Sequence, residues 1–134
     1  KKKGGNPGPE KSKNVNIDDF DPLNIIDQLK DPTFWQTRAT SAYFLSSKNN
    51  FKNLRKNKDN SKFSEMFETL ASLIKDDYSL VVRVEAMKTY KSLACNIEIG
   101  ECNAFTEGNI YNFEAVQDHW KKNKKTILNN FLRK

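Results

Sequence analysis

The feature that most constrains this chain is an internal repeat. Residues 29–45 (LKDPTFWQTRATSAYFL) align without a gap with residues 74–90 (IKDDYSLVVRVEAMKTY), at an offset of 45 residues. Each copy contains an apolar residue, a Lys-Asp pair, and then an apolar-x-x-Arg sequence followed by a small residue. Repeats with periods of about 20–50 residues are typical of stacked units that bury a shared core. The sequence therefore predicts two similar units that pack against each other.

In each copy the Lys-Asp pair marks a turn between two helices. Asp31 and Asp76 suit the N-cap of the second helix, because a carboxylate accepts hydrogen bonds from free backbone N–H groups and favours the positive end of the helix dipole. Pro32 suits the first helical position, where no N–H is needed. Small residues at Ser41 and Ala86 would let neighbouring helices approach closely. Each unit is therefore expected to be a pair of helices.

The apolar residues around these turns have helical spacing. One set follows i, i+3, i+4, i+7, i+11 spacing: Phe63, Met66, Phe67, Leu70 and Ile74. A second set lies on one face of a C-terminal segment: Phe113, Val116, Trp120, Ile127 and Phe131. No segment shows the alternation typical of strands. We predict an all-α fold of antiparallel helix pairs, with helices at about 21–30, 32–48, 61–75, 77–95 and 112–132.

The turn Asp and second-helix Arg at this period resemble the HEAT family of helical repeats. The resemblance covers residues 20–95 and implies a short α-solenoid, stacked from two helix pairs, that serves as a scaffold for a protein partner. A third copy should return near residue 119, but the sequence there reads HWKKNKKTI. The long C-terminal helix is therefore expected either to cap the array or to lead into further repeats.

A second, narrower resemblance lies in the first copy. The string WQTR at 35–38 is similar to the Trp-x-x-Arg in the first repeat of tubulin-binding TOG domains. In that family the Trp and the basic turn residues contact tubulin, which by position implies Trp35, Lys30 and Lys75. A TOG domain has about six repeats, whereas this chain has two.

Composition divides the chain into a leader and one domain. Residues 1–19 contain three of the five Gly and two of the four Pro with almost nothing apolar, which predicts a flexible basic leader. Residues 20–134 are predicted to form one HEAT-like domain, with repeats at about 20–48 and 61–95 and a C-terminal helix at about 112–132. No apolar run is long enough to cross a bilayer.

The turns supply the candidate functional residues, and each has two interpretations. The HEAT resemblance implies that Arg38 and Arg83 each pair with the turn aspartate of their own or a neighbouring repeat, for which Asp31 and Asp76 are available, and so hold the units together in a structural role. The aromatic residues of the two turns could be buried between units or could contact a partner, because aromatic residues are common interface anchors. The partner-binding candidates are Trp35, Lys30, Lys75 and Tyr78.

The net charge of +6 is concentrated in two basic clusters. The first cluster lies between the repeats and comprises Lys48, Lys52, Arg55, Lys56, Lys58 and Lys62. The second lies on the C-terminal helix and includes Lys121, Lys122, Lys124 and Lys125. They are expected to be solvated charges on the surface. The alternative is nucleic-acid binding, in which both clusters would contact phosphates.

Catalytic and metal-binding patterns are missing from the sequence. His119 is the only histidine, and there is no glycine-rich phosphate loop, nucleophile elbow or paired His/Glu metal motif. Cys95 and Cys102 have no second cysteine pair, so they are expected to be reduced thiols of an intracellular protein without metal or other cofactor. We therefore predict a non-enzymatic protein-interaction module, a segment of a larger helical-repeat subunit, with no membrane partner.

Overall fold

The computed structural model describes residues 22–47, 56, 60–95, 106–107 and 110–133. Its helices are α1 (Pro22–Gln28), α2 (Trp35–Leu45), α4 (Asn60–Asp76), α5 (Leu80–Cys95) and α6 (Phe113–Arg133). Two antiparallel strands of two residues, β1 (Thr106–Glu107) and β2 (Ile110–Tyr111), precede α6. The fold is therefore all-α, as predicted. The sequence analysis found no strand, because two residues are too few to show an alternating pattern.

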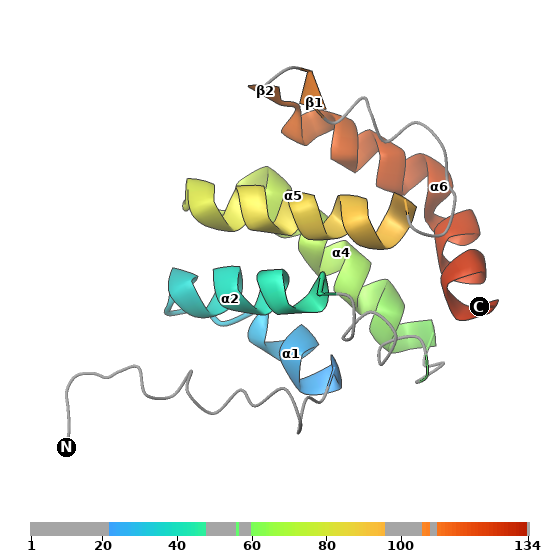
Figure 1. Ribbon diagram of the computed structural model, residues 1–134, viewed down its shortest axis with the longest axis horizontal. Coiled ribbons are helices and arrows are strands. Elements are labelled where there is room, and N and C mark those ends of the chain that lie inside the picture. The colour runs from blue at the N-terminus through green and yellow to red at the C-terminus, as the bar shows by residue number, and fades with distance from the viewer. Residues whose placement is uncertain (1–21, 48–55, 57–59, 96–105, 108–109, 134) are drawn as a thin grey trace.

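The second helix pair lies between the first pair and α6. Helix α1 contacts α2, and α4 contacts α5, so each pair is formed by helices that follow each other along the described chain. Helix α2 lies alongside α5, and α1 also touches α4 (Figure 1). Helix α6 packs mainly on α4 and also reaches α5. This order places α4 and α5 at the centre of the molecule.

The core is built on one aromatic and aliphatic face of α4. All five apolar residues that the helical spacing identified in this segment are fully buried: Phe63, Met66, Phe67, Leu70 and Ile74. The rings of Phe63 and Phe131 meet edge to face with their centroids 4.8 Å apart, and Phe67 stacks on Trp120 at 5.2 Å. The beginning of α4 therefore lies beside the end of α6, and the two helices run antiparallel.

Small residues bring α2 and α5 close together. Ala42 and Ala86 are completely buried, and Ser41 is nearly so. The hydroxyl of the buried Thr89 on α5 donates a hydrogen bond to the carbonyl of Ala42 in the middle of α2. A side chain as short as threonine can reach a backbone carbonyl of another helix only where the two helices approach closely. The small residues thus have the role that the sequence predicts.

The first turn differs from the prediction, because α2 begins at Trp35 rather than at residue 32. The Asp31 carboxylate accepts hydrogen bonds from the N–H groups of Thr33 and Phe34, both at 2.8 Å, as an N-cap would. However, Phe34 has an extended backbone (φ −114°, ψ 114°) that separates this turn from the helix. Asp31 therefore stabilises the loop and does not cap α2.

The second turn also assigns the cap to another residue. Asp76 is the last residue of α4, so it does not cap α5. The Ser79 hydroxyl accepts a hydrogen bond from the N–H of Val82 at 3.3 Å and is the N-cap of α5. The Asp77 carboxylate accepts from the N–H of Ser79 at 2.9 Å and holds the turn. The prediction that Asp76 caps the second helix is therefore wrong, because Ser79 has that role and Asp77 holds the turn.

Candidate functional site

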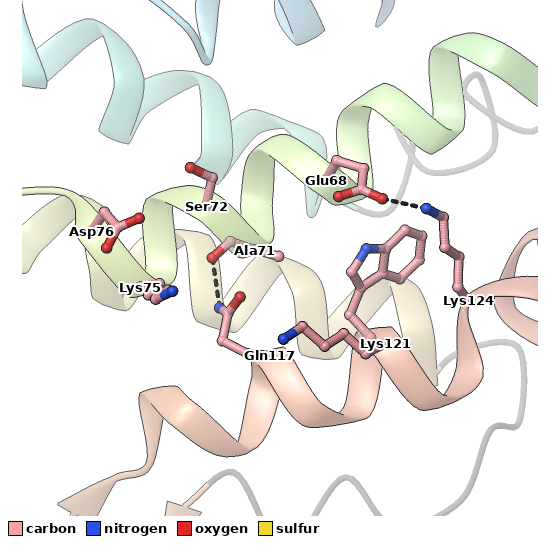
Figure 2. Close-up of a pocket in the computed structure, with 9 residues that line it drawn as sticks. Glu68, Ala71, Ser72, Lys75, Asp76, Gln117, Lys121 and Lys124 are labelled. Carbon is pink, nitrogen blue, oxygen red and sulfur yellow. Dashed lines mark hydrogen bonds and ion pairs between the residues drawn. The ribbon is translucent and has the colours of Figure 1, made fainter.

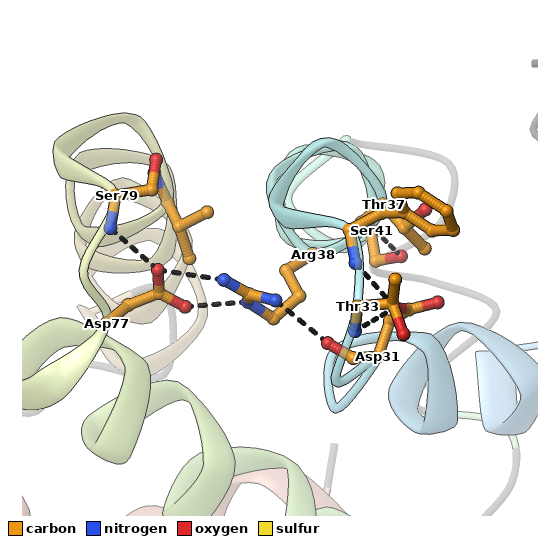
Figure 3. Close-up of polar contacts among 9 residues, drawn as sticks. Asp31, Thr33, Thr37, Arg38, Ser41, Asp77 and Ser79 are labelled. Carbon is orange, nitrogen blue, oxygen red and sulfur yellow. Dashed lines mark hydrogen bonds and ion pairs between the residues drawn. The ribbon is translucent and has the colours of Figure 1, made fainter.

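A buried ion pair joins the two turns (Figure 3). Arg38 donates through Nε to Oδ2 of Asp77 at 2.7 Å and through Nη2 to Oδ1 at 3.1 Å. Its Nη1 donates to the carbonyl oxygen of Asp31 at 2.9 Å. The side chains of Arg38 and Asp77 are only 7% and 3% exposed. The hydrogen bonds to Asp77 raise the pKa of the Arg38 guanidinium above its ordinary value. Arg38 thus links the first helix pair to the second.

Arg83 occupies the equivalent helical position but has different partners. Its Nε donates to the carbonyl of Ile74 in the last turn of α4 at 2.8 Å. Its guanidinium carbon lies 4.3 Å from the centroid of the Phe113 ring at the start of α6. The expected pairing with Asp76 is therefore not formed, because Arg83 faces the end of α4 and the beginning of α6. Both arginines hold helices together, and Arg38 is buried while Arg83 is half-buried.

Four exposed apolar side chains lie at or just before the first residues of α2 and α5. We call this set the corner patch, and it comprises Phe34, Tyr78, Leu80 and Val81. Tyr78 is 77% exposed and Leu80 is 63% exposed. The Arg38 guanidinium carbon lies 5.4 Å from the Tyr78 ring centroid, so a buried cation packs against the face of this exposed ring. An exposed apolar cluster on an otherwise well-packed chain is a typical interaction site.

The residues predicted at this surface have different environments. Tyr78 is in the corner patch, whereas the neighbouring Trp35 is only half-buried at the start of α2. Lys30 is exposed but forms an ion pair with Glu65 of α4. Lys75 is exposed in the last turn of α4. Leu80 and Val81 were not predicted at this surface, although the four apolar residues among the five of LVVRV cannot all face one side of a helix.

A hollow of about 530 Å³ separates the first turn from α4 and borders the corner patch. Its walls include Asp31 and Pro32 from the first turn, Tyr78 from the second turn, and Thr69 and Ser72 from α4. The buried Arg38 also lines it. Tyr78 belongs both to the corner patch and to the wall of this hollow. A partner that covers Tyr78 could therefore place a side chain in the hollow.

The described part of the first basic cluster does not form an uncompensated positive surface. Lys48, Lys52, Arg55 and Lys58 lie outside the described residues, and Lys56 is exposed. Lys62 forms ion pairs with Asp27 of α1 at 3.1 Å and with Glu65 of α4 at 3.4 Å. Lys62 therefore links the beginning of α4 to α1.

The lysines of the second basic cluster have two kinds of environment. Lys124 donates to Glu68 of α4 at 2.5 Å, and this hydrogen bond lowers the pKa of the Glu68 carboxyl. Lys121, Lys122 and Lys125 are exposed on α6. The cluster therefore contains one lysine that fastens α6 to α4 and three that face solvent.

The single histidine is part of the core. His119 is buried, and its Nδ1 lies 2.8 Å from the hydroxyl of Tyr90 on α5. Burial raises the pKa of the Tyr90 hydroxyl well above its ordinary value. The pair connects α5 with α6 inside the molecule, where it lines neither of the two hollows beside α4.

In the described ranges, no three or more His, Cys, Asp or Glu side chains are grouped so that they could hold a metal ion. None of the helices within the described part of the chain is both long enough and apolar enough to cross a membrane. Comparison of the chain with protein-family models, with curated proteins and with solved structures finds no significant match.

Proposed function

We propose that the chain is a non-enzymatic protein-binding module of the HEAT type, part of a helical-repeat scaffold. Two observations support the repeat interpretation. Helices α2 and α5 begin at positions 45 residues apart, as the internal repeat requires, and Arg38 and Arg83 occupy equivalent positions in them. In addition, the second pair stacks on the first through α2 and α5. Stacked repeats present extended surfaces that bind partners.

The exposure of Tyr78 carries the binding proposal. A tyrosine that is 77% exposed, beside Leu80 at 63%, leaves a large apolar area in water. The loss of water from such side chains favours association, and tyrosine is common among the residues that contribute most to protein interfaces. The ring also contacts the buried Arg38, whose cation favours this position of the ring. The partner is therefore expected to present an apolar surface to the corner patch.

A capture experiment with matched variants tests this proposal. The full chain would be immobilised as wild type, as Tyr78→Ser/Leu80→Ser, and as Tyr43→Ser, and proteins bound from an extract of the source cells would be quantified. Tyr43 is 60% exposed on α2 but lies outside the corner patch, so its loss is a matched control. We expect a protein retained by the wild type and by Tyr43→Ser, but lost from the double variant. Equal retention by all three would refute the corner patch as the binding site.

Nucleic-acid binding is a second candidate, supported by the exposed lysines Lys121, Lys122 and Lys125 on α6. Against it, Lys62 and Lys124 are engaged by acidic side chains. A phosphate-binding surface should bind generic DNA and RNA with an affinity that falls steeply between about 50 and 200 mM salt. Neutralising Lys52, Arg55, Lys56 and Lys58 together should lower that slope by roughly one unit per lost contact. A protein-binding module should show neither effect and should keep its protein partner.

A further inference from the structure

Two lysines converge on a hollow between α4 and α6. The hollow has a volume of about 430 Å³ and shares Glu68 and Ser72 of α4 with the hollow that borders the corner patch. Lys75 from the last turn of α4 and Lys121 from α6 enter it from opposite walls, with Gln117 between them (Figure 2). Both lysines are exposed, and no ion pair of either ammonium group occurs among the described residues.

The other charged side chains of the hollow are one ion pair and one aspartate. Lys124 and Glu68 also line it, but they bond to each other at 2.5 Å and together contribute no net charge. Asp76 also lines the hollow at the end of α4 and forms no ion pair with the neighbouring Lys75 within the described structure, so three lysines and two carboxylates give the lining a net positive charge. Two like charges that face one space repel each other, so a negatively charged group between them would be stabilised.

The end of α4 does not need Lys75 to satisfy its carbonyl groups. The amide of Gln117 donates to the carbonyl of Ala71 at 2.6 Å, and Arg83 donates to that of Ile74 at 2.8 Å. The N–H of Asp77 donates to the carbonyl of Leu73 at 3.1 Å. The ammonium group of Lys75 has no hydrogen-bond partner among the described residues, so it is able to bind a group from outside the chain.

We propose that this hollow binds a phosphomonoester, as carried by phosphoserine or phosphothreonine in a partner protein. A phosphomonoester has a charge of about −1.5 to −2 at neutral pH, which matches the two ammonium groups. Lysine binds phosphate as a point charge, whereas planar carboxylates are better matched by arginine. A nucleic-acid diester carries only one negative charge per phosphate. The site is separate from the corner patch, so it does not depend on the function proposed for that patch.

Binding can be followed with the full chain by two-dimensional ¹H–¹⁵N NMR. The probes are a short blocked peptide that contains phosphoserine, the same peptide with serine, and a single-stranded oligothymidylate as the diester. We expect saturable shifts of the Gln117 side-chain amide and the Ser72 backbone amide with the phosphopeptide alone. Gln117 lines only this hollow, whereas Ser72 lines both hollows beside α4, so the Gln117 amide is the specific reporter and Ser72 supports it.

Matched variants separate this site from general attraction to a basic surface. Lys75→Gln and Lys121→Gln should each weaken phosphopeptide binding roughly threefold, and the double variant about tenfold, given the modest strength of exposed ion pairs. Lys122→Gln removes an exposed charge from the same helix outside the hollow and should leave binding unchanged. An effect of Lys122→Gln equal to that of Lys121→Gln would overturn the proposal. Absence of saturation, or equal shifts with serine peptide or oligothymidylate, would overturn it as well.

Discussion

Replacing Asp77 by Ala would leave the Arg38 guanidinium buried with the carbonyl of Asp31 and the Tyr78 ring as partners, but without a carboxylate. Two hydrogen bonds to the carboxylate would be lost, together with the one that Asp77 accepts from the N–H of Ser79. Removing one partner of a buried ion pair typically costs about 3–5 kcal/mol, since the other charge stays buried without compensation. Domains of this kind have a free energy of unfolding of about 5–15 kcal/mol. We therefore expect Asp77→Ala to remove a large share of the stability.

Urea unfolding followed by far-UV circular dichroism would measure this loss. Asp76→Ala is the matched control, because Asp76 is the adjacent aspartate but is exposed at the end of α4, and it should change stability by less than about 0.5 kcal/mol. The double variant Arg38→Met/Asp77→Ala should lose less than the sum of the single losses, because it leaves no unpaired charge. Equal effects of Asp76→Ala and Asp77→Ala, or additive losses in the double variant, would refute the assignment of the ion pair as the link between the helix pairs.

Three further predictions concern stability. Asp31→Ala should cost about 1 kcal/mol in urea unfolding, because its carboxylate holds two backbone N–H groups of the loop; no loss would contradict this role. Thr89→Val keeps the shape of the side chain but loses the hydrogen bond to Ala42, so a loss of about 1 kcal/mol is expected, and an unchanged midpoint would count against the bond. Because burial raises the pKa of Tyr90 above 10.0, the folded chain keeps a proton that the unfolded chain releases at high pH. The free energy of unfolding should therefore fall above about pH 10, by up to about 1.4 kcal/mol per pH unit, and Tyr90→Phe should lack this part of the slope in unfolding curves between about pH 8 and 11.

The helices were predictable where one face alone is apolar. Helix α4 was expected at 61–75 and occupies 60–76, and α6 was expected at 112–132 and occupies 113–133. Their buried residues repeat at helical spacing, so the pattern and the packing agree. Helix α2 began three residues later than expected, because the Asp31-Pro32 sequence forms cap-like hydrogen bonds in a turn that ends at the extended Phe34. The residues alone do not distinguish a capped helix from such a turn.

The sequence predicts that an arginine pairs with a turn aspartate at the candidate site, but it identifies only some of the residues involved. A turn aspartate was expected for Arg38, yet choosing Asp77 over Asp76 depends on which carboxylate points inward at the end of α4. The corner patch includes Leu80 and Val81, whose exposure depends on α5 using its other faces against α2 and α4. The hollow between α4 and α6 depends on the antiparallel packing of helices far apart in the sequence. Local patterns contain no information on such long-range register.

The contact between α4 and α6 has a consequence for synthesis of the chain. Phe63 and Phe67 are covered by Trp120 and Phe131, which lie more than 50 residues later in the sequence. At a translation rate of roughly 5–20 residues per second, α4 is complete for several seconds before α6 has been made. During this interval α1, α2, α4 and α5 can assemble while the aromatic face of α4 remains uncovered. The nascent chain thus presents an apolar surface that the finished chain buries, and chaperones that bind exposed aromatic residues have their best opportunity there.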